Sequence, residues 1–200
     1  MSDNSDLKAL PPALQRVIPA FRRFGWISFW VQVVLAVVAG LIFLFAILVD
    51  SPQATQGAST RNVGTGPGTF FAVLGLITLG ISIYWAFRYT RLAIQLESPN
   101  PKLRPKKADA FQLLQRGLIV NLVGMLFSLM GAEAIGGTLL AKAVQYQAGT
   151  LPTTAVNLNQ FIQPLDIFVV LANTHTIVAH FAGIVTALWL LNWIYNKTQE

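Results

Sequence analysis

The chain alternates long apolar blocks with shorter polar or basic segments. Four mainly apolar blocks cover about residues 26–49, 69–87, 117–140 and 166–195. About 20 apolar residues in a helix are enough to cross a hydrocarbon core of roughly 30 Å. The pattern therefore predicts an all-α integral membrane protein with four transmembrane helices.

The polar segments between these blocks predict the domain organisation. Residues 1–24 form a tail, residues 25–196 a single four-helix membrane domain, and residues 197–200 a C-terminal tail. Within the tail, residues 13–24 place apolar side chains near helical spacing and arginines on the remaining surface, which predicts a short interfacial amphipathic helix. Because Pro19 interrupts this segment, an unstructured basic tail is the alternative.

The distribution of charge predicts how the four blocks are oriented across the membrane. The net charge is +6, and basic residues gather before the first block and in the loop 88–116, whereas only Arg61 and Lys142 fall on the opposite side. Since positive charge marks the cytoplasmic side, we expect both termini and the basic loop 88–116 to be cytoplasmic. The loop either binds anionic lipid head groups or acts only as a topology signal. Charges placed at helix ends do not indicate nucleic-acid binding.

Composition narrows the chemistry. Only 11% of the residues are charged, against about 25% in soluble domains, and there is no cysteine. Disulfides, thiolate metal sites, iron–sulfur clusters and thiol catalysis are therefore excluded. No block contains a dense set of nucleophile, base and metal ligands, so we expect no enzymatic activity and no bound cofactor.

The third block carries a row of small residues. Four of them recur every four positions and lie along one helical face: Gly124, Ser128, Ala132 and Gly136. Such a row lets a neighbouring helix approach closely. It predicts a packing face, which a homo-oligomer can also use.

Polar side chains inside the blocks are the candidate functional residues. Glu133 lies in the third block, and Asn173, His175 and His180 lie in the fourth. An ionisable group within a span costs a few kcal/mol unless it is paired or hydrated, so it suggests function. At 1.5 Å per residue, Glu133, Asn173 and His175 come to similar depth, with His180 nearer the middle. His180 shares a face with Asn173.

These four residues predict a transient metal-ion transport site, because imidazole and carboxylate groups suit divalent metals. Proton transfer through a histidine is a related possibility. His175 and His180 are five positions apart, about 140° around a helix, which disfavours both as ligands of one ion. Two further interpretations stay open: a protonated or hydrogen-bonded Glu133 with the histidines as satisfied interhelical polar groups, or a site that recognises a substrate or partner. Gln32 in the first block predicts one interhelical hydrogen bond or a polar path.

Two segments carry a resemblance. With the four-span plan, FRRFGWISFWVQ at the start of the first block and NTHTIVAHFAG in the fourth resemble a family of small membrane proteins of cyanobacteria and plastids. Its plant members are the chloroplast inner-envelope "permease in chloroplasts" proteins, also described as a component of the inner-envelope protein import machinery. The resemblance implies either permeation of iron or another metal ion, or a non-catalytic role in a translocon or larger membrane complex. The N-terminus lacks transit-peptide features, which suggests a cyanobacterial plasma or thylakoid membrane.

Overall fold

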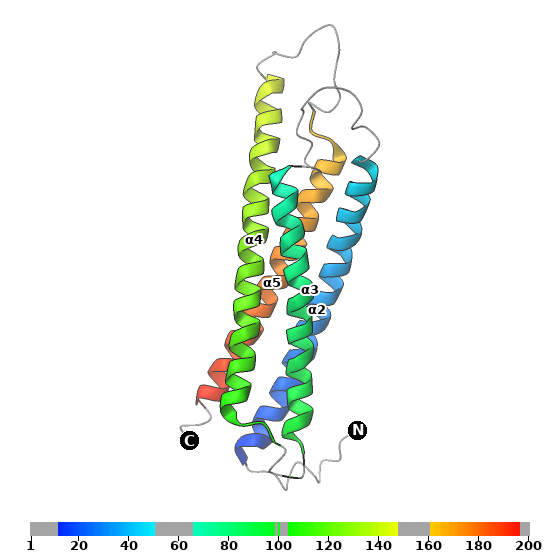
Figure 1. The fold of residues 1–200 in the computed structure, drawn as a ribbon. Coiled ribbons are helices and arrows are strands. Elements are labelled where there is room, and N and C mark those ends of the chain that lie inside the picture. The colour runs from blue at the N-terminus through cyan, green and yellow to red at the C-terminus, as the bar shows by residue number, and fades with distance from the viewer. Residues whose placement is uncertain (1–11, 51–65, 99, 101–103, 148–160, 197–200) are drawn as a thin grey trace. The chain divides into compact units, whose positions relative to one another are not determined.

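Four long α-helices make up nearly all of the structure, a computed structural model that describes residues 12–50, 66–98, 100, 104–147 and 161–196. They are α2 (Pro12–Asp50), α3 (Pro67–Leu96), α4 (Lys107–Gln147) and α5 (Pro164–Asn196), drawn in Figure 1. Each is long and apolar enough to cross a membrane. The prediction of an all-helical chain with four candidate spans is confirmed.

The first helix differs from its prediction. Residues 13–24 do not form a separate interfacial helix but continue into the first span as part of α2. The reason is that Ile18 and Phe21 are each only 1% exposed. They pack in one apolar cluster with residues of the other three helices, including Leu92, Leu114 and Leu190, rather than facing lipid head groups.

The basic segment 88–116 is also mostly helical rather than a loop. α3 continues to Leu96 and α4 begins at Lys107. Tyr89, Leu92 and Leu96 extend the helical spacing of α3 and are buried, which stabilises the additional turns. At the start of α4 the carboxylate of Asp109 accepts the Lys106 amide at 2.9 Å and so caps the helix.

Buried positions along the helices alternate spacings of three and four residues. In α5 this buried seam consists of Asp166, Val169, Asn173, Thr176, His180, Gly183, Ala187, Leu190 and Ile194. In α3 it consists of Gly68, Ala72, Gly75, Leu79, Ser82, Ala86, Tyr89, Ala93 and Leu96. An average of 3.5 residues is the repeat of left-handed coiled-coil packing, which many membrane bundles share.

The seams are smaller and more polar than the outer surface. Leu41 and Leu48 of α2 are 62% and 63% exposed, whereas Ser82 of α3 and Ser128 of α4 are 0% exposed. A soluble protein places its large apolar side chains inside. The reversed arrangement indicates that lipid surrounds these helices, because hydrocarbon chains solvate leucine as well as a protein core does.

The chain divides into two compact units. Unit 1 comprises Met1–Val34, Thr78–Val123 and Ala179–Glu200, and unit 2 comprises Leu35–Ile77 and Gly124–Val178. Each unit contains segments of all four helices and its own apolar cluster, with Phe21 and Tyr89 in unit 1 and Phe43 and Ile135 in unit 2. Among the described residues, Lys142 is the one Lys or Arg in unit 2.

Candidate functional site

A buried polar cluster in unit 1 joins all four helices. We call it the amide cluster, and it consists of Ser28 and Gln32 from α2, Ser82 from α3, Asn121 from α4 and His180 from α5. Each of these side chains is at most 2% exposed. Buried polar groups are costly without hydrogen-bond partners, and here the partners come from different helices, so the cluster favours one arrangement of the helix faces in unit 1.

Ser82 stands at the centre of the amide cluster. Its Oγ lies 2.7 Å from Gln32 Oε1 and 2.7 Å from Asn121 Oδ1. One hydroxyl carries one proton, so Ser82 donates to one of these oxygens at a time. Both contacts are hydrogen bonds at the same time when the Gln32 side-chain amide is turned by 180°. Its nitrogen then donates to Ser82, its oxygen accepts from Ser28, and Ser82 donates to Asn121.

Asn121 sets the protonation of His180. The Asn121 Nδ2 donates to the carbonyl of Gly117 at 2.9 Å, which leaves its Oδ1 as an acceptor. His180 Nδ1 lies 3.1 Å from that oxygen and therefore carries the proton. Gly183, one turn from His180, makes room for this amide, because a Cβ there would lie 2.7 Å from Asn121 Cγ.

Unit 2 holds a second buried amide at Asn173. Its Nδ2 donates to the backbone carbonyl of Ser128 at 2.9 Å and so joins α5 to α4. Its Oδ1 is buried and has no hydrogen-bond partner among the described residues. One turn away, the buried hydroxyl of Thr176 donates to the carbonyl of Ala172. An unpaired buried carbonyl oxygen is an acceptor for a water molecule or a cation.

A buried ion pair in unit 2 joins the last part of α4 to the start of α5. Lys142 Nζ lies 2.8 Å from Asp166 Oδ2, and both side chains are less than a tenth exposed. The same carboxylate accepts the amide of Gln163 at 3.0 Å, and Pro164 opens α5, so Asp166 also caps that helix. The sequence places Lys142 and Asp166 near the ends of consecutive blocks, but opposite charge at two helix ends does not by itself predict pairing.

The predicted metal-site residues lie in different surroundings. Glu133 is exposed on α4 and has no hydrogen bond or ion pair within the described part of the chain. His175 is half-buried, with its Nδ1 2.7 Å from the carbonyl of Leu171 in its own helix. Asn173 and His180 are buried in the contacts given above.

Glu133 and His175 point away from the place where α5 meets α4. Glu133 is five residues beyond Ser128, about 140° around α4, and His175 is two residues beyond Asn173, about 200° around α5. Nowhere in residues 12–50, 66–98, 104–147 or 161–196 do three or more His, Cys, Asp or Glu side chains form a group that could hold a metal ion. The four residues are therefore not gathered, and their transport role stays a prediction.

Part of the site could be predicted from the sequence. Asn173 and His180, which were expected to share one face of α5, are both buried. Gln32 makes the interhelical contact expected of it. Asn121 was not predicted, although it occupies the seam spacing of α4 three residues before Gly124, and that spacing is the signal that could have found it.

The fold and the amide cluster define the class: an all-helical integral membrane protein whose helix seams carry buried polar groups. The chain belongs to the family described as "Protein of unknown function (DUF3611)", whose model matches residues 11–195. It is similar to Protein TIC 21, chloroplastic, of Arabidopsis thaliana, with 33% identity over an alignment of 201 positions that covers 99% of this chain. The chain spans 64% of that relative's length. No solved structure matches it.

Proposed function

We propose that this protein is a membrane transport protein with permease-like activity towards a divalent metal ion such as iron. The observation that carries the proposal is the stripe of buried polar residues along α5, with Asn173 and Thr176 in unit 2 and His180 in unit 1. Polar residues inside spans are costly, and where they occur they commonly mark a path for an ion or proton. Membership of a family with a plastid relative, and the resemblance to plastid permeases, support the same reading.

The stripe offers ligands of the right kind. The carbonyl oxygen of Asn173 lacks a hydrogen-bond donor, and amide oxygen and imidazole nitrogen both bind first-row divalent metals. The proton on His180 Nδ1 is held by Asn121, in the way that metal-binding histidines are held by an acceptor on their other nitrogen. Glu133, exposed on α4, and His175, half-buried on α5, lie outside this stripe.

Metal flux into liposomes containing the purified protein tests this proposal. Asn173→Leu keeps the branched shape of the side chain and removes the oxygen, so flux should fall about tenfold or more, as for lost partners of metal ligands. Thr174→Val, on the neighbouring exposed position, is the matched control and should keep flux within about twofold. Glu133→Gln and His175→Ala test the other two predicted residues separately. Equal flux for wild type and Asn173→Leu would contradict a transport site at Asn173 on α5.

A second candidate function is that of a non-catalytic subunit of a protein translocon or another membrane complex. The observation that favours it is the exposed face of α4 around Glu133, where Gly136 and Gly137 have no atom within 4 Å of an added Cβ. A carboxylate facing lipid costs a few kcal/mol, which a contact with another subunit would relieve.

Single cysteines test the second candidate cleanly because the chain has none of its own. With Gly137→Cys we expect cross-links to another subunit in native membranes, and with Gly80→Cys, an exposed glycine of α3 without neighbours, we expect none. Equal cross-linking at both positions would argue against a specific surface on α4. Cross-linking to identical copies would indicate a homo-oligomer, and cross-linking to other proteins a larger complex.

A further inference from the structure

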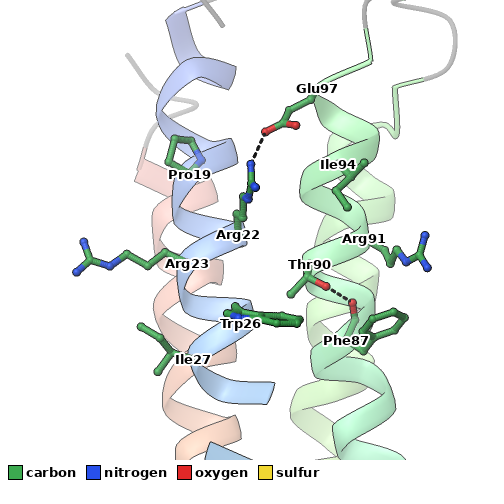
Figure 2. A pocket seen from close by; sticks show the side chains of 10 residues that line it. All are labelled: Pro19, Arg22, Arg23, Trp26, Ile27, Phe87, Thr90, Arg91, Ile94 and Glu97. Carbon is green, nitrogen blue, oxygen red and sulfur yellow. Dashed lines mark hydrogen bonds and ion pairs between the residues drawn. The ribbon is translucent and has the colours of Figure 1, made fainter. Parts of the chain in front are cut away.

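Glu133 differs from the other acidic side chains that the structure describes, because it makes no hydrogen bond or ion pair within the described part of the chain. Each of the others has a partner: Glu97 lies 3.9 Å from Arg22 (Figure 2), Asp109 caps α4, and Asp166 pairs with Lys142. A carboxyl group inside a span is costly unless it is paired or hydrated. Glu133 therefore needs a partner from outside its own chain.

The face of α4 around Glu133 is apolar and open. Leu129 and Leu140 are 44% and 65% exposed. Gly136 and Gly137 have no atom within 4 Å of an added Cβ. Glycines on an exposed helix face let the backbone of another helix approach closely. This face thus has both the room for a second helix and a polar group that a second helix could satisfy.

His175 is a second polar group directed away from the interior of unit 2. Its Nδ1 lies 2.7 Å from the carbonyl of Leu171 and therefore carries a proton, which leaves Nε2 of the neutral ring as an acceptor. Nε2 has no hydrogen bond to a described residue. Leu171 and Val178, on the same face of α5, are 46% and 48% exposed. This imidazole nitrogen is thus also open to a group from another chain.

The two groups lie at similar depth in unit 2. The ion pair of Lys142 with Asp166 joins the last part of α4 to the start of α5. Glu133 is nine residues before Lys142, and His175 is nine residues after Asp166. Nine residues rise about 14 Å along a helix, so each group lies about that far from the ion pair. Within one chain they do not meet, because both point away from the contact between α4 and α5.

We propose that α4 of one copy of this protein packs against α5 of a second copy, so that Glu133 hydrogen-bonds to His175 of the second copy. The carboxyl oxygen and Nε2 share one proton, and each group supplies the partner that the other lacks. Their similar depth allows this contact between two copies inserted in the same orientation. Lipid chains or an apolar helix of another protein would leave both groups unpaired. The proposal stands apart from transport, since it concerns only a contact between copies.

Cross-linking between two differently tagged copies tests the proposal, because the chain has no cysteine of its own. One copy carries Gly137→Cys, a turn beyond Glu133, and the other carries Leu171→Cys, a turn before His175. The copies are co-expressed, purified and reconstituted without other proteins at a low ratio of protein to lipid. Oxidation should then join the two tags in one product. Leu41→Cys, an exposed position of α2 in unit 2, replaces Leu171→Cys in the control and should give little of that product.

Variants of the two polar groups test whether they hold the copies together. Either E133L or H175L, placed in both copies, should lower the cross-linked fraction about threefold or more, because the hydrogen bond between copies is lost. The double variant E133H/H175E exchanges the two groups across the contact and should restore the cross-linked fraction. Thr174→Val, which removes a hydroxyl bonded within α5, should leave it unchanged. Circular dichroism of each variant confirms that its helices are intact.

Four results would overturn the proposal. The first is the absence of the cross-linked product, and the second is an equal amount of it with Leu41→Cys, which would indicate random collision. The third is preferential linking of Gly137→Cys to Gly137→Cys, which would pair α4 with α4 of the second copy. The fourth is an undiminished product in both E133L and H175L, which would mean that the copies meet without this hydrogen bond.

Discussion

Polar residues in this protein act by being buried together. Gln32, Ser82, Asn121 and His180 come from four different helices, and each would be unfavourable alone in an apolar interior. In the cluster these side chains hydrogen-bond to one another instead of to water. Because the Ser82 hydroxyl has one proton, it donates one of its hydrogen bonds and accepts the other. The amide cluster thus selects one arrangement of helix faces in unit 1 out of many with similar apolar contacts.

Asn121→Leu should destabilise the protein by about 1–2 kcal/mol, because Ser82 and His180 then lose a buried acceptor. Thr174→Val is the control, since the hydroxyl of Thr174 is exposed and bonds only to the carbonyl of Val170 in its own helix. Unfolding by titration with a denaturing detergent, followed by circular dichroism, measures both variants. If Asn121→Leu and Thr174→Val unfold at the same concentration of denaturing detergent, the cluster has little structural role.

At the scale of the helix, small residues decide how closely α3 and α4 pack in unit 2. A Cβ on Gly131 would lie 2.9 Å from the backbone nitrogen of Ala72, and one on Gly75 would collide with the hydroxyl of Ser128. The predicted small-residue row is therefore a packing face within the chain at Ser128. Gly136, the last member of the row, is exposed.

Gly131→Ala should destabilise the protein by about 1–3 kcal/mol, because the added methyl meets backbone that cannot turn aside. Gly80→Ala should be neutral or slightly stabilising, since alanine favours helix and nothing lies within 4 Å of its Cβ. The two variants are compared by thermal unfolding in detergent. Equal stability of both would mean that the contact at Gly131 can relax at no cost.

The four helices could be predicted from the sequence because apolar length alone identifies a span. Their ends could not, because apolar and basic residues such as Tyr89 and Arg91 continue a helix beyond the apolar core when Leu92 and Leu96 find buried neighbours. The polar face of α5 followed from helical spacing. Its partner Asn121 did not, since pairing requires the register between helices, which spacing within one helix does not contain.

For the whole molecule, the distribution of charge predicts an orientation. The described basic residues other than Lys142 belong to unit 1, and Lys142 is neutralised by Asp166 at 2.8 Å. Among the described residues, Lys142 is therefore the one basic residue outside unit 1, and its pair with Asp166 has no net charge. The distribution of basic residues predicts the orientation with the unit 1 helix ends in the cytoplasm.

Single cysteines at Lys107 and Tyr146, near opposite ends of α4, test this orientation. In spheroplasts of a bacterium expressing the protein, a membrane-impermeant maleimide should label Tyr146→Cys directly and Lys107→Cys only after permeabilisation. The wild-type chain, without cysteine, is the blank. The opposite labelling order would invert the orientation, and direct labelling at both positions would argue that α4 does not span the membrane.

Large apolar side chains lie outside and small ones inside, and this arrangement has a consequence for which substitutions can accumulate in the sequence during evolution. Lipid is fluid and accepts any bulky apolar shape, so Leu41 and Leu48 can exchange with Ile, Val or Phe at little cost. Gly131 can only remain small, because its neighbour is backbone. Among descendants of a common ancestor, the largest side chains should therefore vary most, and the smallest should persist.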